Sequence, residues 1–211
     1  MTEEIFRSPK KRGKVVVFLS GRGSNFLAIH DGIREGRINA DIVLVFSNKK
    51  EAKGLELARE QGLETFFLDP KEFGSREEYD QRAAEEVEKR KTDLICLAGY
   101  MRIITPQFCQ RFKNRMMNIH PALLPAFPGL HVQKKAVEWG VRYSGATVHF
   151  VIPEVDMGPI ILQAVVPVKQ GDTEDSLSQR ILKEEHKIYP EAVKLYFEGR
   201  IEVRGRRVFI L

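Results

Sequence analysis

The sequence contains few of the features that define disulfide scaffolds, secreted proteins or membrane proteins. Only two cysteines, Cys96 and Cys109, occur in 211 residues, and they form no C-x-x-C pair. Cys96 lies inside an apolar run, so we expect a buried thiol in a reducing compartment. No apolar stretch reaches the roughly 18 residues of a membrane span, and the first residues lack the apolar segment of a secretory signal. These absences predict a cytoplasmic protein that does not interact with membranes.

The chain also lacks a strong excess of either charge. It has 34 Lys and Arg against 29 Asp and Glu, a net charge of +5, with 43% hydrophobic and 30% charged residues. This composition excludes a collagen or a disordered polyelectrolyte. A mild basic excess favours an anionic partner, and phosphorylated metabolites, polyglutamates and nucleic acid all fit. Nucleic acid is the least expected of these, because the basic runs 10–12 and 204–207 lie at opposite ends without interleaved aromatic residues.

The first hundred residues alternate between apolar runs and polar, helix-forming segments. The apolar runs are short and rich in β-branched residues, as in strands buried on both faces. Strands are predicted at 14–20, 41–47, 65–68 and 93–98, and helices at 26–35, 52–61 and 75–91. The last helix begins with a predicted capping box of Ser75 and Glu78. The alternation predicts an α/β protein with an open, mostly parallel, Rossmann-like sheet and helices on both faces.

The second half has a different pattern. We expect short helices at 106–112 and 132–139, strands at 116–119, 145–152 and 160–166, a long helix at 173–197 that bends at Pro190, and a terminal hairpin at 200–211. The strands at 145–152 and 160–166 are close enough in sequence to pair, so the sheet becomes mixed here. Without repeats or low-complexity linkers, residues 1–211 are predicted to form one domain, with residues 1–13 as a polar extension before the first strand.

A glycine-rich turn, Ser20-Gly-Arg-Gly-Ser-Asn25, separates the first predicted strand from its helix. Glycines let the backbone approach a ligand, and N–H groups at a helix N-terminus favour phosphate. A dinucleotide site is not indicated, because Phe26 stands where the third glycine is required and the second strand ends in Ser47-Asn48 without an acidic residue. A P-loop is excluded because no G-K-[ST] follows. A tight turn without a ligand remains the alternative.

Two polar segments in the second half carry residues suited to acyl transfer. Asn118 and His120 share one face of a predicted strand, and an amide donor beside an imidazole can stabilise a carbonyl oxygen that becomes negative. Asp156 stands in the loop 153–159, where a carboxylate can orient a histidine and favour its protonated form. The alternative is that these residues cap turns.

Together these segments resemble the phosphoribosylglycinamide formyltransferase family in motif, order and spacing over Lys14 to Glu202. The segments that carry the resemblance are Ser20–Asn25, Ala98–Ile103, Asn118–Pro125, Pro128–His131 and His149–Pro159. The resemblance implies the formyltransferase fold. It also implies transfer of a formyl group from 10-formyltetrahydrofolate to the amine of glycinamide ribonucleotide, in purine biosynthesis. The region up to about residue 100 would be the nucleotide-binding half, and the remainder the folate-binding and catalytic half.

The same resemblance assigns roles to individual residues. The implied catalytic residues are Asn118, His120 and Asp156. The implied ribonucleotide contacts are Gly23, Ser24, Asn25 and Glu185. The implied folate contacts are Arg76, Leu97, Met101, Arg102, Ile103, Ile152 and Val155. One departure stands at Leu182, one turn before Glu185, where relatives often carry a polar residue.

These residues support direct attack of the amine on the formyl carbon. Asn118 and protonated His120 would stabilise the oxyanion, while Asp156 would support the charge of His120 and help the amine proton reach the leaving nitrogen. We expect no metal, because the five histidines show no H-E-x-x-H spacing, and no covalent nucleophile, because no G-x-S-x-G elbow occurs. His149 lies in an apolar strand and is interpreted as a structural core residue.

Two alternatives follow from the same residues. Hydrolysis of formyltetrahydrofolate is the nearer one, since water could replace the amine. A non-catalytic nucleotide-binding module would explain the glycine turn but would not need the catalytic trio. Related formyl-group enzymes with a further domain are not expected at this length. The protein is expected to be a monomer or a weak homodimer.

Overall fold

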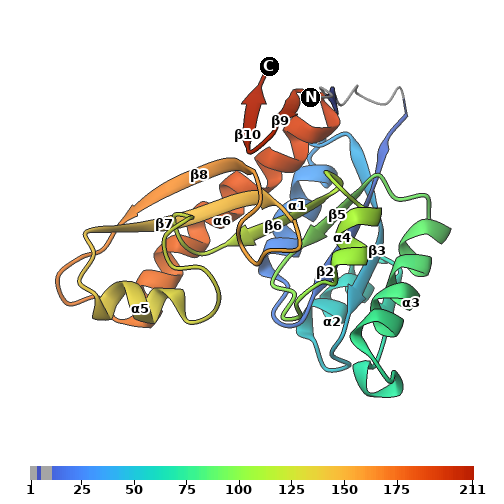
Figure 1. The fold of residues 1–211 in the computed structure, drawn as a ribbon, viewed down its shortest axis with the longest axis horizontal. Helices are drawn as coiled ribbons and strands as arrows, with labels where there is room; N and C mark the ends of the chain where they lie inside the picture. The colour runs from blue at the N-terminus through green and yellow to red at the C-terminus, as the bar shows by residue number, and fades with distance from the viewer. Residues whose placement is uncertain (1–3, 6–10) are drawn as a thin grey trace.

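The computed structural model describes residues 4–5 and 11–211 and contains a ten-stranded sheet (Figure 1). The strands lie in the order β1-β9-β10-β8-β7-β6-β5-β2-β3-β4. Their bounds are β1 Glu4–Ile5, β2 Gly13–Leu19, β3 Ala40–Ser47, β4 Thr65–Phe67, β5 Leu94–Leu97, β6 Met116–His120, β7 Tyr143–Phe150, β8 Ile160–Pro167, β9 Ile201–Arg204 and β10 Arg207–Ile210.

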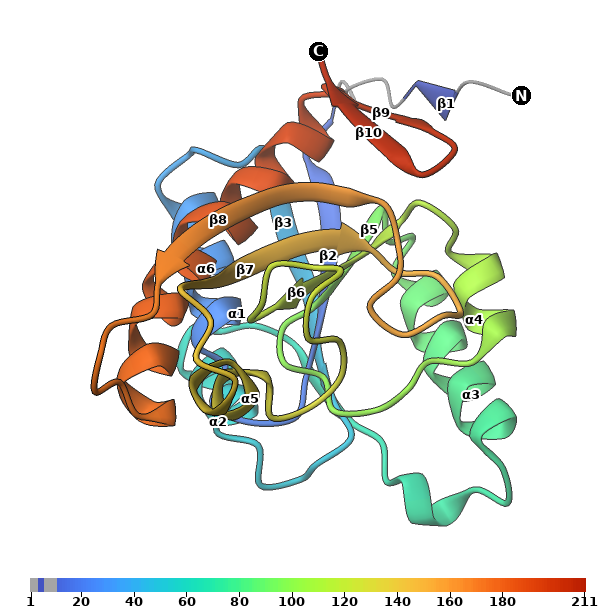
Figure 2. The same cartoon turned by 60° about the vertical axis from the view of Figure 1, so that its left-hand side comes forward.

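Helices cover both faces of this sheet, as predicted (Figure 2). They are α1 Ser24–Arg34, α2 Lys53–Glu60, α3 Arg76–Lys89, α4 Pro106–Arg111, α5 Val132–Glu138 and α6 Glu174–Phe197, with a 3₁₀ turn at Pro70–Glu72. Side chains alternate along β2, so Val15 and Val17 pack in the cluster with α1, α2 and α6, whereas Val16 and Phe18 pack with α3 and α4. Because β2 is buried on both faces, its residues Val15–Leu19 form an unbroken apolar run.

The pairing of the strands explains where a ligand can bind. β2 pairs in parallel with β3 on one side and with β5 on the other, and β5 pairs in parallel with β6. After β2 the chain adds β3 and β4 on one side of it, and then returns to add β5 on the other side, so the strand order reverses between β2 and β5. In open α/β sheets such a switch point opens a crevice at the carboxyl ends of the strands. β7 pairs antiparallel with β6 and β8, which confirms the mixed sheet of the second half.

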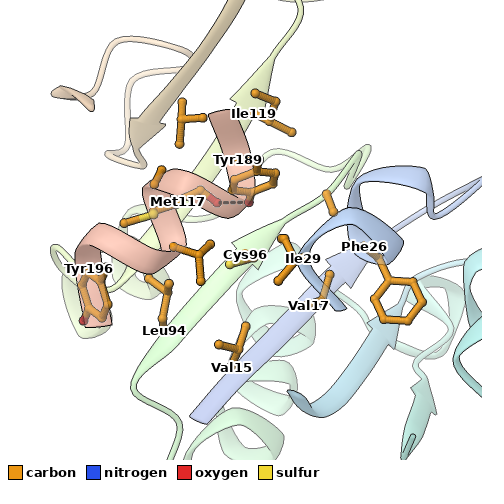
Figure 3. Packing of buried hydrophobic residues seen from close by; sticks show 14 of the residues in the cluster. Val15, Val17, Phe26, Ile29, Leu94, Cys96, Met117, Ile119, Tyr189 and Tyr196 are labelled. Atoms are coloured by element: carbon orange, nitrogen blue, oxygen red, sulfur yellow. Dashed lines mark hydrogen bonds between the residues drawn. The ribbon is translucent and has the colours of Figure 1, made fainter. Parts of the chain in front are cut away.

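The long helix α6 crosses the sheet behind this crevice. Pro190 lies inside the helix, which continues to Phe197. The buried hydroxyl of Tyr189 lies 3.0 Å from the carbonyl oxygen of Met117 (Figure 3) and 3.1 Å from that of Leu97. Those carbonyl groups belong to β5 and β6, so one tyrosine fixes the helix to the two strands that lead into the crevice.

Two local predictions need correction. Ser75 caps α3 by accepting a hydrogen bond from the Glu78 backbone N–H at 3.1 Å. However, the Glu78 carboxylate accepts from the Gly74 N–H at 3.0 Å, so the predicted reciprocal box does not form. In the predicted polar extension, Glu4–Ile5 forms β1 and pairs antiparallel with β9. The first residue of the basic run 10–12 lies outside the described residues.

The predicted C-terminal hairpin and the predicted buried thiol are confirmed. β9 and β10 form the expected antiparallel C-terminal hairpin. Both cysteines are free and buried, and burial raises the pKa of Cys96 to about 12 and that of Cys109 to about 11. No helix within 4–5 and 11–211 combines the length and the apolarity needed to cross a bilayer.

Candidate active site

A cavity of about 780 Å³ opens at the carboxyl ends of β2, β5 and β6. Its lining comes from the glycine turn, the segment after β5, the end of β6, the loops around 129–133 and 151–156, and α6. Most of the residues selected from the sequence border this one space, among them the three catalytic candidates, the four ribonucleotide candidates, and Leu97, Met101, Arg102, Ile103, Ile152 and Val155. Arg76 does not line it.

The glycine turn is held rigidly at the switch point. Gly23 has φ of 79°, and a Cβ at this position would lie 2.6 Å from the Gly54 Cα, so no other residue fits without strain. The Gly54 N–H donates to the Gly21 carbonyl at 2.9 Å. Across the crevice, the Ser20 hydroxyl accepts a hydrogen bond from the Met101 N–H at 2.8 Å. The helix α1 begins at this turn, and its first residues, Ser24 and Asn25, line the cavity, so an anion is favoured there.

Asn25 and Glu185 form a buried pair behind the turn. The Asn25 Nδ2 donates to the Glu185 carboxylate at 2.7 Å, and the two side chains come from α1 and α6. Burial raises the pKa of Glu185, while Asn25 and Arg22 act in the opposite direction. The Asn25 Oδ1 is buried and has no hydrogen-bond partner among the described residues. A buried acceptor without a partner is destabilising.

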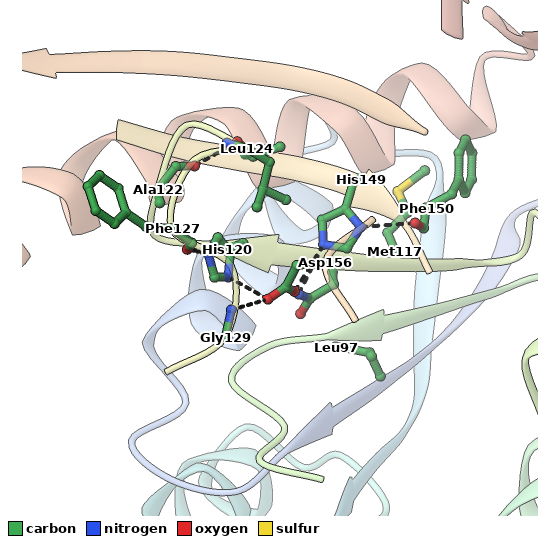
Figure 4. Close-up of polar contacts among 12 residues, drawn as sticks. Leu97, Met117, His120, Ala122, Leu124, Phe127, Gly129, His149, Phe150 and Asp156 are labelled. Atoms are coloured by element: carbon green, nitrogen blue, oxygen red, sulfur yellow. Dashed lines mark hydrogen bonds and ion pairs between the residues drawn. The ribbon is translucent and has the colours of Figure 1, made fainter. Parts of the chain in front are cut away.

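His120 lies at the end of β6 and is buried (Figure 4). Its Nε2 is 2.8 Å from the Phe127 carbonyl oxygen, and its Nδ1 is 3.4 Å from the Asp156 carboxylate. A carbonyl can only accept, so Nε2 carries the hydrogen. The longer Nδ1 distance exceeds that of an ordinary N–H···O bond, which fits a neutral ring.

Burial determines the protonation of His120. It lowers the pKa below the ordinary value, and the opposing effects of Asp156 and the Phe127 carbonyl do not offset it. The sequence predicts that Asp156 favours the protonated form. The carboxylate does act in that direction, but burial outweighs it in the free protein, and a protonated His120 during the reaction stays a prediction. A negative charge developing in the cavity would raise this pKa again.

Asp156 is presented by a constrained loop between β7 and β8. Its φ of 55° lies in the left-handed region, and its Oδ2 accepts a hydrogen bond from the Gly129 N–H at 2.8 Å. Burial by itself would raise the pKa of Asp156, but His149, the Gly129 N–H and His120 together lower it. The group is therefore a carboxylate at neutral pH, and it faces His120 as predicted.

His149 is the residue that the sequence interpretation missed. It is buried, as expected of a core residue, but its Nε2 lies 3.2 Å from the Asn118 amide nitrogen and 3.7 Å from the Asp156 carboxylate. Its Nδ1 lies 2.9 Å from the Phe150 carbonyl, which assigns the hydrogen to Nδ1. Nε2 then accepts from Asn118, fixing the amide so that its second N–H remains available.

The loop that carries Asp156 is supported from two directions. A Cβ on Gly158 would lie 1.7 Å from the Phe150 carbonyl oxygen, so the loop can pass β7 this closely only with glycine. From the C-terminal hairpin, the Arg206 guanidinium donates to the Met157 carbonyl at 3.1 Å. The position of the carboxylate therefore depends on contacts from β7 and from the turn between β9 and β10.

The opposite end of the cavity is apolar. Met101, Ile103 and Val155 are 61%, 57% and 48% exposed, unusually high for large apolar side chains that border a cavity. Arg102 stacks over the Tyr79 ring at 4.2 Å, and its buried Nε has no partner among the described residues. This wall suits a flat, largely apolar ligand with acceptor groups at its edge. In the described part of the chain, no three His, Cys, Asp or Glu residues are grouped to hold a metal ion.

Comparisons with known proteins agree with this geometry. The formyl transferase family profile matches residues 13–193. The chain is 44% identical over 196 residues to phosphoribosylglycinamide formyltransferase of Escherichia coli, covering 93% of this chain and 92% of that protein. It is 46% identical over 192 residues to the trifunctional purine biosynthetic protein adenosine-3 of Drosophila melanogaster, covering 90% of this chain but only 14% of that longer protein.

A solved structure gives the same result in three dimensions. The glycinamide ribonucleotide transformylase 1 of Symbiobacterium toebii superposes with a TM-score of 0.94 at 50% identity, over 96% of each chain. The fold, the cavity and the extent of these matches lead to one conclusion: the chain belongs to the formyl transferase family, and within it to the phosphoribosylglycinamide formyltransferases.

Proposed function

We propose that this protein transfers the formyl group of 10-formyltetrahydrofolate to the amine of glycinamide ribonucleotide, giving formylglycinamide ribonucleotide and tetrahydrofolate in purine biosynthesis. The observation that carries the proposal is the placement of Asn118, His120 and Asp156 in one cavity, between an anion-favouring turn and an apolar wall. A phosphorylated amine and an apolar formyl donor can then meet at the trio.

The reaction requires stabilisation of one oxygen. When the amine nitrogen forms its bond to the formyl carbon, the carbonyl oxygen becomes negative. The free N–H of Asn118 and the Nε2–H of His120 are the donors for it, and each such donor typically contributes a factor on the order of 10²–10³ to kcat. The amine then loses a proton, the donor nitrogen accepts one, and the carbon–nitrogen bond to the donor breaks.

His120 and Asp156 act together in this proposal. In the free protein the His120 Nε2–H is used by the Phe127 carbonyl, so the formyl oxygen has to replace that acceptor. As negative charge develops, the imidazole gains affinity for a proton, and the carboxylate 3.4 Å away stabilises the resulting cation. His149 keeps the Asn118 amide in the orientation that leaves one donor free.

The same proposal includes the residues that would contact each substrate. The ribonucleotide would be held by Gly23, Ser24 and Asn25, in the nucleotide-binding half up to about residue 100, and by Glu185 on α6. The folate would be held mainly by the remainder of the chain. Its contacts would be the apolar wall of Met101, Ile103, Ile152 and Val155, together with Leu97 and Arg102. Arg76 would contact the glutamate tail of the folate. Residues 1–211 would act as one domain.

We further propose a cytoplasmic monomer or weak homodimer that binds no nucleic acid. The two buried free thiols support a reducing compartment. Cell fractionation tests the location, sedimentation tests the oligomeric state, and a salt-dependent gel shift tests nucleic-acid binding.

Hydrolysis of the formyl donor is the competing reaction at the same residues. Tetrahydrofolate release by the purified protein is measured with and without glycinamide ribonucleotide. The proposal predicts release that depends on the ribonucleotide and equals the formylated product. Release at the same rate without the ribonucleotide, with formate as the product, would contradict it.

A further inference from the structure

The end of the cavity at the glycine turn has two cationic side chains whose role the proposed function leaves open. Arg22 lies at the centre of the turn and Lys49 follows β3, and both line the cavity. Neither forms a salt bridge or a side-chain hydrogen bond with another residue of the described chain. By contrast, Arg12 at the other end of β2 pairs with Asp41 at 2.8 Å.

The helix α6 contributes Ser178, Leu182 and Glu185 to the cavity lining, and none of these is a cation. Leu182 has no hydrogen-bonding group, and Glu185 is already bound to Asn25. The described residues of α6 at the cavity therefore offer an anion no positive side chain, whereas the turn offers Arg22, which also acts to lower the pKa of Glu185.

Two further observations show that this end is built for a ligand. The N-terminus of α1, an eleven-residue helix, opens at the turn, and its Gly23 N-cap has no side chain that could occupy the first N–H groups. Asn25 borders the cavity and is 9% exposed, and its Oδ1 is buried without a hydrogen-bond partner among the described residues. The helix end favours a ligand with an anionic group.

On the basis of the proposed function, we propose that the Arg22 side chain is a specificity-determining contact for the phosphate of the ribonucleotide. The guanidinium of Arg22 carries a full positive charge and directed N–H donors. The backbone N–H groups of the turn carry only partial charges. The Leu182 side chain on α6 has no polar group that could make such a contact. Lys49 adds charge on the same side without the planar, bidentate geometry of arginine.

This assignment makes a specific kinetic prediction. A charge-assisted hydrogen bond to phosphate stabilises the bound substrate and the transition state equally, so its loss raises KM and leaves kcat nearly unchanged. For Arg22→Ala we expect KM for glycinamide ribonucleotide to rise about 10- to 100-fold, with KM for the formyl donor unchanged. Arg22→Lys should recover part of the loss.

The decisive comparison uses a substrate without the phosphate. Wild-type protein, Arg22→Ala and the matched control Arg142→Ala, an exposed arginine outside the cavity, are assayed with glycinamide ribonucleotide and with the corresponding ribonucleoside. The inference predicts that Arg22→Ala differs from wild type with the ribonucleotide only, and that Arg142→Ala matches wild type with both. An equal effect on both substrates, or no effect on either, would overturn it.

A binding measurement separates this inference from the proposed reaction. Ribose 5-phosphate is titrated into wild type and Arg22→Ala by calorimetry at two salt concentrations. Weaker, less salt-dependent binding by the variant supports the phosphate contact, even if wild type transfers no formyl group and the proposed function fails. Equal binding by the two proteins refutes the contact, even if formyl transfer by wild type is normal.

Discussion

Replacement of Asp156 by asparagine removes one negative charge from the site and keeps its shape. The Oδ2 that accepts from the Gly129 N–H at 2.8 Å can remain as the amide oxygen, so the loop keeps its main anchor. What is lost is the carboxylate that faces the His120 Nδ1 at 3.4 Å. Because Asp156 raises the pKa of His120 against the effect of burial, the variant should have a still lower His120 pKa.

The size of this effect follows from the distance. For unit charges 3.4 Å apart, Coulomb's law with an effective dielectric constant of ~20 gives about 5 kcal/mol as an upper figure. Opposite charges this close typically shift a pKa by about 1–3 units. If the imidazolium forms in the transition state, the same energy is lost from catalysis, and kcat falls about 10- to 1000-fold.

Two measurements test the reasoning together. The His120 pKa is followed by NMR of the imidazole C–H resonances in wild type and Asp156→Asn, and kcat is measured on the same samples. Asp31→Asn serves as the control, because Asp31 forms an exposed ion pair with Arg34 at 3.2 Å on α1. A folded Asp156→Asn with an unchanged His120 pKa and kcat within a factor of two of wild type would refute the coupling.

Three further predictions follow from individual contacts. Gly23→Ala places a Cβ at positive φ and 2.6 Å from the Gly54 Cα, so the free energy of unfolding should fall by at least ~2 kcal/mol in urea denaturation. Arg206→Ala removes the contact with the Met157 carbonyl and should lower kcat/KM for the formyl donor about two- to tenfold; an unchanged value would mean that the hairpin does not position the loop. Burial lowers the pKa of His120, so between that lowered value and ~6.5 the unfolded chain binds more protons than the folded protein, and stability decreases as pH falls. For His120→Gln, the plot of thermal stability against pH should have a smaller slope across that window. An equal slope in the variant and wild type would contradict the assignment.

The sequence predicts the sheet because its strands are buried on both faces. Runs such as Val15–Leu19 are apolar without alternation, which is typical of parallel strands under two layers of helices. Asn118 and His120 could be placed on one face because residues two apart in a strand point the same way. These are local properties, and local patterns express them directly.

What the sequence does not predict depends on contacts between distant segments. His149 faces Asn118 because β6 and β7 pair in one particular register, with an irregularity between Val148 and His149 in the pairing to β8. An apolar strand with one histidine gives no indication of that register. The protonation of His120 likewise depends on burial by segments elsewhere in the chain, and the pairing of β1 with β9 involves only two residues.

Transfer of a ¹³C-labelled formyl group in a single turnover tests the proposed reaction most directly. The protein, in excess over labelled 10-formyltetrahydrofolate, is mixed with glycinamide ribonucleotide, and the label is followed by NMR in wild type and Asn118→Ala. We expect all of the label in the amide of the ribonucleotide with wild type, at a rate at least about 100-fold above that of the variant. Label appearing as free formate, or equal rates in the two proteins, would contradict direct transfer at Asn118.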